Sequence, residues 1–486
     1  MPPFTNYHRI VSLNTLKCSF SKPKSRQKMN EITHDQINSQ SYDVIIVGAG
    51  AGGLLTALVL TNLGKNVLIL EKSNHLGGVW FGYDVNGFRV DNGIHVITRV
   101  KNGAFSRLLR TYLDPPPEFI LHEGWYFRVH DKVGTIPSTV GETLRWPLTD
   151  LKGRLGLARI GAKIKTMKLE EMKKYKDISF LEFMKSKGAT NQVMLDVMQS
   201  AIFLAAGVPI DKASAYESLR TLKDTDKESS KLGSAKRLLF GDADYDEGYV
   251  IGGMKGLVER VIEAIDGDYV LNANVEKITE TDGQVTGVVV NGKQINKSAI
   301  ISNIPLWDMP SIIKSNNPKV TTFFNEWDNM LVTRGLTLWL GLDEIVIGDR
   351  KSRVLVHPNP NRWIISISSF DPSAAPDGKE LIAIATMRDE SMSVDEQVGV
   401  MLSNGFDKYY PEVLKHIEMK HIQTSYATRA ALIPGQTDLD RPGPITPIQG
   451  LFIVGTDTAG SGVGLQQAAS SAEGVVRAIT SFWANS

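Results

Sequence analysis

A short segment near the start of the chain, residues 42–71, most constrains how this sequence can fold. Its apolar run Tyr42-Asp43-Val44-Ile45-Ile46-Val47 has the length and β-branched content of a buried parallel strand, and it breaks into Gly48-Ala49-Gly50-Ala51-Gly52-Gly53. A segment of helical composition follows over residues 54–63, and a second apolar run over 66–70 ends at Glu71. This order predicts a strand, a helix and a second, parallel strand, with the glycines at the first turn.

The glycine turn has the composition of a dinucleotide-binding site. In the pattern G-x-G-x-x-G, the first glycine permits a tight turn, the second lets backbone N–H groups approach a pyrophosphate, and the third lets helix and strand pack closely. Glu71 stands at the end of the second strand, where a carboxylate accepts hydrogen bonds from ribose hydroxyls and repels a 2′-phosphate. We therefore expect residues 48–53 and Glu71 to bind a dinucleotide. The alternative is that the glycines serve packing alone.

The residues after Glu71 resemble a known family. Lys72-Ser73-Asn74-His75-Leu76-Gly77-Gly78 runs from the acid into a Leu-Gly-Gly turn, as in the superfamily of flavin-containing amine oxidases and phytoene desaturases. The resemblance implies FAD as the cofactor, with contacts from Lys72, Gly77, Gly78 and Val79. Members of the family usually carry an arginine after the paired glycines, where this chain has Val79-Trp80. Arg89 is the candidate to replace that contact.

Two segments farther along resemble the same family. Phe88-Arg89-Val90-Asp91-Asn92-Gly93-Ile94-His95 is similar to a family segment that passes near the flavin ring, so the resemblance makes His95 a candidate for contact with flavin or substrate. A histidine that is hydrogen-bonded between domains is the alternative. Residues 249–257 are similar to the family's Gly-Gly-Met segment, which leads into a helix.

Three short strands are expected at residues 275–279, 285–290 and 299–303, and the last of them is expected to return toward the first domain. Asp282-Gly283 and Asn291-Gly292 separate them, and both pairs favour hairpin turns because glycine accepts positive φ. The family has a three-stranded excursion from its dinucleotide sheet at this place. The resemblance therefore implies that the backbone of Val275 lies against the adenine end of the cofactor.

The C-terminal segment holds a second glycine-rich turn after a strand. Residues 450–455 form an apolar run, and residues 456–464 lead into a helix that begins near Leu465. The resemblance implies contacts from Gly455, Asp457 and Val463 to the ribityl chain or the diphosphate. Relatives often have Gly-Asp directly after the strand, whereas this chain has Gly455-Thr456-Asp457. Thr456 is therefore the alternative to Asp457.

The expected architecture is an α/β fold of two interleaved domains, because 486 residues with 42% hydrophobic content exceed one core. The resemblance implies a Rossmann-type FAD-binding domain, a parallel sheet with a three-stranded β excursion, formed by residues 41–100, 241–305 and 441–486. An α+β substrate domain takes residues 101–240 and 306–440. Strands at 334–342, 363–369 and 381–387 are expected there. Their apolar face, with Leu336, Leu338, Leu340 and Leu342, floors an apolar substrate cavity or serves packing alone.

Residues 1–28 differ in composition from the rest of the chain, since they carry six basic residues and no acidic one. This is typical of an organelle transit peptide, and a start of translation at Met29 is the alternative. We exclude residues 1–40 from the expected fold. Cys18, the one cysteine, lies in this head, so no disulfide, thiolate metal site or cysteine nucleophile is expected in the folded part. The compartment, cytoplasmic or organellar, stays open.

Charge and hydropathy bear on the partners. The formal net charge of +1 argues against a nucleic-acid partner, and the sequence has no apolar run of the ~18 residues that a spanning helix requires. Residues 152–168 interleave six basic residues with apolar ones. This stretch is either an amphipathic helix on an anionic membrane or an ordinary solvated helix.

The resemblance implies an FAD-dependent oxidoreductase that oxidises, desaturates or isomerises a small apolar, carotenoid- or isoprenoid-like substrate. No second G-x-G-x-x-G unit is present for a nicotinamide cofactor, so oxygen, a quinone or a protein is the expected electron acceptor. Without zinc-ligand spacing or a nucleophile elbow, the cofactor is expected to carry the chemistry, and no metal is expected. A flavin amine oxidase or a protoporphyrinogen-oxidase-like enzyme is the alternative. A binding protein like the Rab GDP-dissociation inhibitors, which share the architecture without flavin, is a third.

Overall fold

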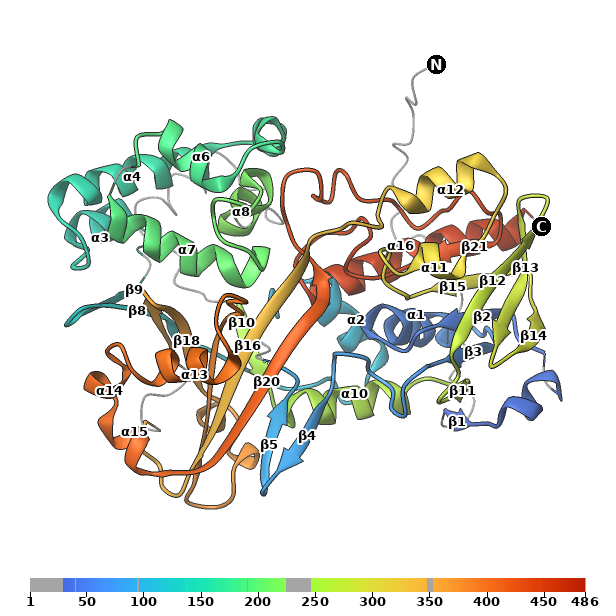
Figure 1. Cartoon of the computed structure of the whole chain (residues 1–486), viewed down its shortest axis with the longest axis horizontal. Coiled ribbons are helices and arrows are strands. Elements are labelled where there is room, and N and C mark those ends of the chain that lie inside the picture. Colours follow the sequence, from blue (N-terminus) through green and yellow to red (C-terminus); the bar gives the residue numbers. More distant parts are fainter. Residues whose placement is uncertain are drawn as a thin grey trace.

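Two large sheets organise the chain, a six-stranded parallel sheet and a seven-stranded sheet beside it (Figure 1). The structure is a computed structural model, and it describes residues 29–39, 41–93, 96–135, 137, 139–189, 191–223, 246–347 and 353–485. The expected class, a mixed α/β fold with a parallel sheet, is confirmed.

The parallel sheet gathers strands from distant parts of the sequence. Its order is β1 (Asn30–Glu31), β11 (Asp268–Val270), β3 (Val67–Leu70), β2 (Val44–Val47), β15 (Ile300–Ser302) and β21 (Leu451–Ile453), with all neighbouring pairs parallel. Helix α1 (Ala51–Asn62) connects β2 to β3, as the sequence predicts. Because the strands are parallel, the residues that follow β2, β3, β15 and β21 meet at one edge of the sheet.

Both faces of the parallel sheet are buried, which explains why its strands are continuous apolar runs. Val44 and Ile46 point to one face and Ile45 and Val47 to the other, in the alternation that a strand imposes. The first face packs against α1, α2 (Ala104–Tyr112), α10 (Gly253–Glu263) and α16 (Leu465–Ala484). The second face packs against the β12–β14 sheet, α11 (Met309–Ile312) and α12 (Pro318–Asn325).

The three-stranded excursion differs from the expectation in its last strand. It consists of β12 (Val275–Thr281), β13 (Gln284–Val290) and β14 (Lys293–Asn296), all antiparallel. The run at residues 299–303 returns to the first domain as expected and forms β15 of the parallel sheet. The third strand of the excursion is therefore β14 and not this run. Strand β14 is mostly polar, with Ile295 as its buried apolar residue, so hydropathy alone does not reveal it.

The seven-stranded sheet contains the three strands expected in the second half of the chain. Its order is β20 (Ile417–Ala430), β16 (Val332–Leu342), β19 (Glu380–Met387), β18 (Asn361–Ser366), β17 (Arg353–Pro358), β8 (Gly124–Val129) and β9 (Lys132–Thr135). All neighbours are antiparallel except β17 and β8. Strands β16 and β20 are the longest, and Figure 1 shows them running from the second sheet toward the parallel sheet.

The two faces of this sheet have different partners. Leu336, Leu338, Leu340 and Leu342 pack in one cluster with α13 (Val394–Leu402), α14 (Phe406–Tyr409) and α15 (Pro411–Lys415). Trp339 lies on the opposite face, in a cluster with residues of several helices that precede α8. The leucine face therefore packs against helices, and the face that bears Trp339 is the one turned toward the helical part of the chain.

That helical part lies at one end of the molecule (Figure 1). It consists of α3 (Val140–Arg145), α4 (Leu151–Thr166), α5 (Leu169–Met172), η3 (Lys173–Tyr175), α6 (Phe180–Ser186), α7 (Gln192–Ala206) and α8 (Ala215–Leu222). Smaller elements join the two sheets: β4 (Gly82–Val85), β5 (Phe88–Asp91), β6 (Ile97–Thr98), β7 (Phe119–Leu121), β10 (Glu247–Val250), η4 (Ile367–Ser369) and η5 (Pro372–Ala374). Across the described ranges, no helix has the length and hydropathy to cross a membrane.

The exclusion of residues 1–40 from the fold is wrong for residues 29–39. Strand β1 pairs in parallel with β11, and η2 (His34–Ser39) follows it. Met29 and Ile37 are buried, with Ile37 in the core on the second face of the sheet. Strand β1 forms hydrogen bonds with the backbone groups at the open edge of β11. The polar composition of residues 29–39 does not reveal this long-range pairing. Residues 1–28, including Cys18, lie outside the described residues.

We predict that Ile37→Ala lowers the free energy of unfolding by about 2–4 kcal/mol, because it leaves a cavity in a buried cluster. Chemical denaturation followed by circular dichroism measures the effect. The matched control is Ile345→Ala, since Ile345 is 59% exposed and its truncation removes little packing. Equal stability of the two variants would show that residues 29–39 do not pack on the sheet in solution.

Candidate functional site

The glycine turn between β2 and α1 is closed so tightly that side chains do not fit. A Cβ on Gly53 would lie 2.1 Å from the carbonyl oxygen of Gly48, and one on Gly50 would lie 2.9 Å from Asn303 Oδ1. Gly48 itself has φ +94°, in the region that favours glycine. The turn therefore presents backbone amides rather than side chains, as the G-x-G-x-x-G pattern predicts.

Helix α1 directs the positive end of its dipole at this turn. Its N-cap residue, Gly50, has no side chain to cap the first amides. The amide of Gly53 donates to Asn303 Oδ1 at 3.0 Å. The amides of Ala51 and Gly52, as the first in the helix, have no acceptor within it. Such a helix start attracts an anion, and a diphosphate is the anion that this turn can approach closely.

Glu71 follows β3 and is fixed beside the turn. Its Oε2 accepts a hydrogen bond from the Ala49 amide at 2.7 Å, and its Oε1 accepts two from Ser73, from the amide at 2.9 Å and from the hydroxyl at 2.8 Å. A carboxylate has about four acceptor positions, so one remains for a ligand hydroxyl. Glu71 is only 6% exposed. The structure thus brings Glu71 together with the glycine turn.

The Leu-Gly-Gly turn lies directly against the first glycine turn. The Gly77 amide donates to the Ala49 carbonyl at 2.9 Å, and a Cβ on Gly78 would lie 3.1 Å from Gly50 Cα. Both glycines have positive φ. Next in sequence, the side chain of Val79 is 48% exposed. Lys72 is exposed as well.

Arg89 does not take the place of the missing family arginine in this structure. Its guanidinium forms an ion pair with Asp371 and a hydrogen bond of 3.2 Å to Ser373 Oγ. Asp371 also accepts the Gly252 amide at 2.7 Å. Arg89 therefore ties β5 to η5 and, through Asp371, to the turn before α10.

Val275 begins β12 beside Glu71. The Ala273 amide donates to the Glu71 carbonyl at 2.8 Å, and the Asn272 amide donates to the Ser73 carbonyl at 3.0 Å. These bonds hold the start of β12 against the end of β3. Val275 lies next to this contact, at the end of the site where the Glu71 carboxylate lies.

Asn303, which sequence reasoning treated only as a strand end, is the central polar residue of the site. Its amide donates to the Val47 carbonyl at 2.7 Å, its Oδ1 accepts the Gly53 amide, and its Nδ2 donates to the Val454 carbonyl at 2.8 Å. The backbone of Asn303 thus bonds to β2, and its side chain links α1 to the residue that follows β21. In the sequence, the signal for this role is a polar residue directly after a buried strand. The sequence does not show that this strand pairs between β2 and β21.

Asp457 lies in the second glycine-rich turn, and its carboxylate points into the protein. Oδ2 accepts the Leu306 amide at 2.5 Å, and the residue is 5% exposed. Burial is the largest influence on it and raises the pKa of the carboxyl to about 6, while the Leu306 amide and Arg441 act in the opposite direction. Asp457 therefore holds the turn against the segment after β15.

The other expected residues of this turn are Gly455 and Val463. The Gly455 amide donates to Ser471 Oγ at 3.2 Å, which fastens the turn to α16. Val463 packs against the cluster that contains Trp339. The alternative residue, Thr456, offers its carbonyl to Arg441 Nη1 at 2.8 Å.

Arg441 is a second residue that sequence reasoning missed. Besides Thr456, its guanidinium donates to the carbonyls of Ala430 and Ala431, at 3.3 and 3.1 Å. It is 4% exposed. Arg441 therefore connects the end of β20, in the seven-stranded sheet, with the turn that follows β21.

His95 and Ile94 lie outside the described residues, so the expectation for His95 stays a prediction. The preceding residue, Gly93, donates its amide to Gln423 Oε1 at 2.9 Å. Gln423 Oε1 also accepts from Trp339 Nε1 at 2.8 Å, and its Nε2 donates to Tyr83 Oη at 2.8 Å. Gln423, another residue missed from sequence, thus joins the segment before His95 to β16 and β20.

Asp91 and the Gly-Gly-Met segment form a buried contact between β5 and α10. Asp91 Oδ1 accepts the Met254 amide at 2.9 Å, and Asp91 Oδ2 accepts the Tyr249 hydroxyl at 2.5 Å. Burial raises the pKa of the Tyr249 hydroxyl, and the adjacent Asp91 raises it further. Within the described part of the chain, no group of three or more His, Cys, Asp or Glu side chains is arranged to hold a metal ion.

We predict that Asp457→Asn is more stable relative to the wild type at pH 7 than at pH 4. The folded pKa of about 6 lies above the ordinary value of 3.8, so the folded state keeps a proton that the unfolded state has lost. The stability that this group contributes therefore falls as the pH rises from about 4 to about 6, by up to ~3 kcal/mol. Asparagine stays neutral and can still accept the Leu306 amide.

Urea denaturation of both proteins across this pH range measures the difference. The control is Asp266→Asn, because Asp266 is exposed and its difference from the wild type should not depend on pH in the same way. A constant difference for Asp457→Asn from pH 4 to pH 7 would contradict the raised pKa.

Comparisons with known proteins agree with the resemblance seen in the sequence. A sequence model of the family described as flavin containing amine oxidoreductase matches residues 51–480. The crystal structure of an oxidoreductase from Methanosarcina mazei superposes with a TM-score of 0.68 at 20% identity, over 89% of this chain and 99% of that one. This likeness shows the fold.

Two curated relatives match shorter regions. The all-trans-retinol 13,14-reductase of Homo sapiens is 39% identical over 70 residues, which are 14% of this chain and 12% of that protein. The chloroplastic prolycopene isomerase 2 of an Oncidium hybrid cultivar is 24% identical over 299 residues, which are 56% of this chain and 49% of that protein. This chain thus matches half or less of the length of either relative. Because the family model covers most of the chain, the chain belongs to the flavin-containing amine oxidoreductases and is a FAD-dependent oxidoreductase.

Proposed function

We propose that the parallel sheet and its glycine turn form a Rossmann-type FAD-binding domain built from residues 41–100, 241–305 and 441–486. Residues 101–240 and 306–440 then form the substrate domain. The donor set fits FAD: the amides of Ala51 and Gly52 and the α1 dipole suit the diphosphate, and Glu71 has an acceptor position for a ribose hydroxyl. The first turn is tight because its backbone atoms are in close contact, at Gly48, Ala49, Gly50 and Gly53. The Leu-Gly-Gly turn, with Gly77 and Gly78, packs against it.

The second glycine turn completes this proposed site. The ribityl chain and the ring of the cofactor would lie next to Gly455 and Val463. The turn itself is held in place by the hydrogen bonds of Asp457 and Arg441. Val275 flanks the adenine end, and Lys72 and Val79 are exposed at the rim. When bound, the flavin supplies hydride or electron transfer. The protein's own task is to hold the substrate and exclude water.

We propose that the substrate is an apolar, carotenoid- or isoprenoid-like molecule. The observation that carries this proposal is the apolar cluster between the seven-stranded sheet and helices α6–α8. It contains Trp339 and Ala383 from the sheet and Phe203 from α7, and it extends to Phe88 of β5 and to Val463 of the second glycine turn. Apolar side chains thus continue from the helices to the proposed flavin site, which suits a water-insoluble substrate.

The two partial relatives support this class, since one is an all-trans-retinol reductase and the other a prolycopene isomerase. We propose oxidation, desaturation or isomerisation as the reaction, with oxygen, a quinone or a protein taking up electrons where oxidation is net. Removal of a hydride to a flavin depends on alignment of the substrate and on exclusion of water more than on acid–base groups. The family description itself favours the second candidate, an amine substrate.

We predict that purified protein shows a flavin absorption band and that a polyene substrate bleaches this band under anaerobic conditions. Amines and porphyrinogens serve as parallel titrants. An isomerase leaves the band unchanged and rearranges the polyene only after chemical reduction of the flavin, which chromatography detects. Bleaching by an amine or a porphyrinogen, with no effect of polyenes in either redox state, would overturn the proposed substrate class.

The control for this titration is Gly78→Ala. At Gly78, φ is +60°, so alanine strains the backbone by about 1–2 kcal/mol. Its Cβ would also lie 3.1 Å from Gly50 Cα and narrow the space between the two turns. We expect a folded protein, by circular dichroism, with little bound flavin. A normal flavin content in this variant would place the cofactor elsewhere.

We also propose that the α3–α4 end of the molecule contacts an anionic membrane surface. On α4, Ile160 and Ile164 are buried and pack against the rest of the protein. Other apolar residues, however, are turned outward: Leu144, Leu151 and Leu155 are 40%, 64% and 54% exposed. Lys152 and Arg159 are exposed on the same helix. Leucines beside basic side chains suit the headgroup region of an anionic bilayer.

We predict that Leu151→Gln/Leu155→Gln weakens binding to vesicles of phosphatidylserine and phosphatidylcholine roughly tenfold or more, because two apolar side chains no longer leave water. Vesicle sedimentation measures the bound fraction. Ile445→Gln is the matched control, since Ile445 is 67% exposed and belongs to a loop before β21. Equal binding of the two variants would exclude this surface.

A further inference from the structure

The apolar cluster between the seven-stranded sheet and helices α6–α8 contains a tryptophan, Trp363 of β18, that is 0% exposed. Its indole Nε1 has no hydrogen-bond acceptor among the residues that the structure describes. Three other tryptophans belong to this cluster or pack against it, and each has an acceptor. Trp125 donates to His122 Nε2 at 2.8 Å, Trp146 to the Thr135 carbonyl at 2.7 Å and Trp339 to Gln423 Oε1 at 2.8 Å. Trp363 therefore differs from its neighbours.

The indole ring of Trp363 is held on several sides. Trp125 packs against it edge to face, with ring centroids 4.6 Å apart and an angle of 88° between the planes. In the sheet, Trp363 is paired with Val356 of β17 and with Ala385 of β19. Because the whole side chain is buried, its N–H cannot reach solvent and remains in apolar surroundings.

A second buried donor lies on the same face of β18. Side chains two residues apart on a strand point to the same side, so Asn361 and Trp363 both face the helices. Asn361 Oδ1 accepts from Ser200 Oγ of α7 at 2.7 Å, which agrees with this direction. Asn361 Nδ2 is shielded from solvent and, within the described part of the chain, has no partner. Two donors thus lie on one face of β18, where this strand meets α7.

Donors of this kind call for an acceptor. A buried polar group that gives up its hydrogen bond to water and gains none in the protein destabilises the fold, and native proteins rarely keep one unbonded. An indole N–H can only donate, and the free amide nitrogen of Asn361 also donates, so the missing partner is an oxygen. Both donors are uncharged, which suits an uncharged hydroxyl or carbonyl group.

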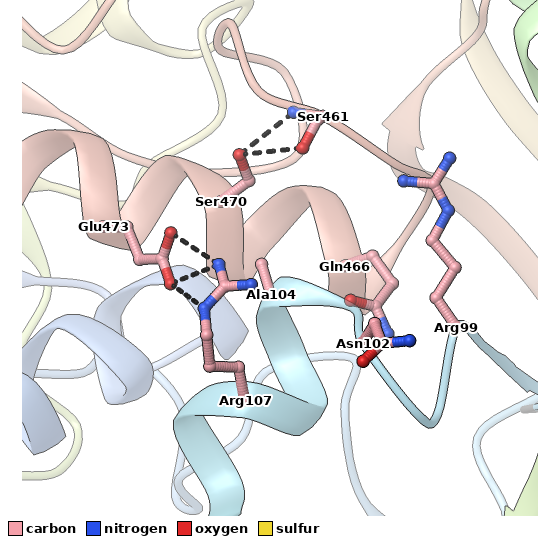
Figure 2. Close-up of a pocket in the computed structure, with 8 residues that line it drawn as sticks. All are labelled: Arg99, Asn102, Ala104, Arg107, Ser461, Gln466, Ser470 and Glu473. Carbon is pink, nitrogen blue, oxygen red and sulfur yellow. Dashed lines mark hydrogen bonds and ion pairs between the residues drawn. The ribbon is translucent and has the colours of Figure 1, made fainter. Parts of the chain in front are cut away.

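The polar cavity of about 360 Å³ between α2, α16 and the loop before α16 is different in this respect (Figure 2). There Arg107 Nη2 contacts Glu473 at 2.7 Å, and Gln466 Oε1 accepts the Phe105 amide at 2.9 Å. These groups satisfy one another, whereas the two donors on β18 lack an acceptor.

We propose that the substrate carries a hydroxyl or carbonyl oxygen and that Trp363 Nε1, with Asn361 Nδ2 on the same face, donates to this oxygen. The inference rests on the isoprenoid-like substrate proposed above and makes it an oxygenated isoprenoid rather than a hydrocarbon. Trp363 then binds the polar group, while the apolar side chains of the cluster hold the rest of the molecule. Its role is recognition of the substrate, not transfer of the hydride.

Binding of two matched polyenes to the flavin-loaded protein tests the inference. The probes are retinol and axerophtene, the hydrocarbon in which a methyl group replaces the hydroxymethyl group of retinol, and their own fluorescence reports binding. We expect the wild type to bind retinol about tenfold more tightly, because retinol alone offers an acceptor to the buried donors. Equal affinities would overturn this inference and leave the isoprenoid class intact. Binding of neither polyene would overturn both.

The variant Trp363→Phe removes the N–H and keeps an aromatic ring. It is expected to lower the preference for retinol over axerophtene about tenfold, and this ratio cancels any loss of packing that affects both ligands alike. A retained preference would show that the N–H serves a buried water instead and would overturn the inference. Since the wild-type preference is measured without any variant, the inference can fail even if Trp363→Phe does not fold.

The matched control is Trp327→Phe. Trp327 Nε1 is also buried and, among the described residues, has no partner, but Trp327 belongs to the cluster on the second face of the parallel sheet. Trp327→Phe makes the same chemical change outside the proposed substrate region, so it should keep the wild-type preference. An equal loss of preference in both variants would also contradict the assignment to Trp363.

Discussion

The close backbone contact at the glycine turn is the constraint on which the rest of this structure depends. Gly53 approaches the carbonyl of Gly48 so nearly that even a methyl group would collide with it. This contact lets α1 start directly at the end of β2 and aim its amides at the edge of the sheet. Asn303 then uses all of its amide group to fix β21 and α1 in the same place. The rigid, side-chain-free turn that results is what a diphosphate requires.

Three polar residues connect the elements around the glycine turns to the rest of the molecule through hydrogen bonds. Arg441 joins the second glycine turn to the end of β20, Gln423 joins the segment after β5 to β16 and β20, and Asp371 joins η5 to the start of α10. Each is buried. Arg441 donates to three backbone carbonyls, and Gln423 and Asp371 each bond to both backbone and side-chain groups. A buried polar side chain is tolerated only when it is hydrogen-bonded, so these links fix the two sheets relative to each other with little freedom. Substrate placement over a flavin depends on such fixed geometry.

The expectations that the structure changes share a physical cause, which is dependence on distant partners. Arg89 lies near the glycines in sequence, but Asp371, far along the chain, neutralises it. The alternating leucines of β16 face α13–α15, because those helices cover that side of the sheet. The polar composition of residues 29–39 does not reveal a strand, yet the open edge of β11 gives β1 a partner. None of these outcomes can be read from a window of neighbouring residues.

The sequence by itself determined the glycine turn, the parallel strands β2 and β3 on either side of it, the helix between them and three antiparallel strands of the second sheet. These features are local, since a strand, a glycine turn, a helix and an acidic residue within some thirty positions carry their own geometric requirements. Only the tertiary structure decided that Asn303, Gln423 and Arg441 connect separate elements and that the Asp457 carboxylate is buried. Those roles arise where strand ends and helix faces from separate parts of the chain meet. Burial there strengthens the hydrogen bonds of each polar group, and the sequence position alone does not reveal that burial.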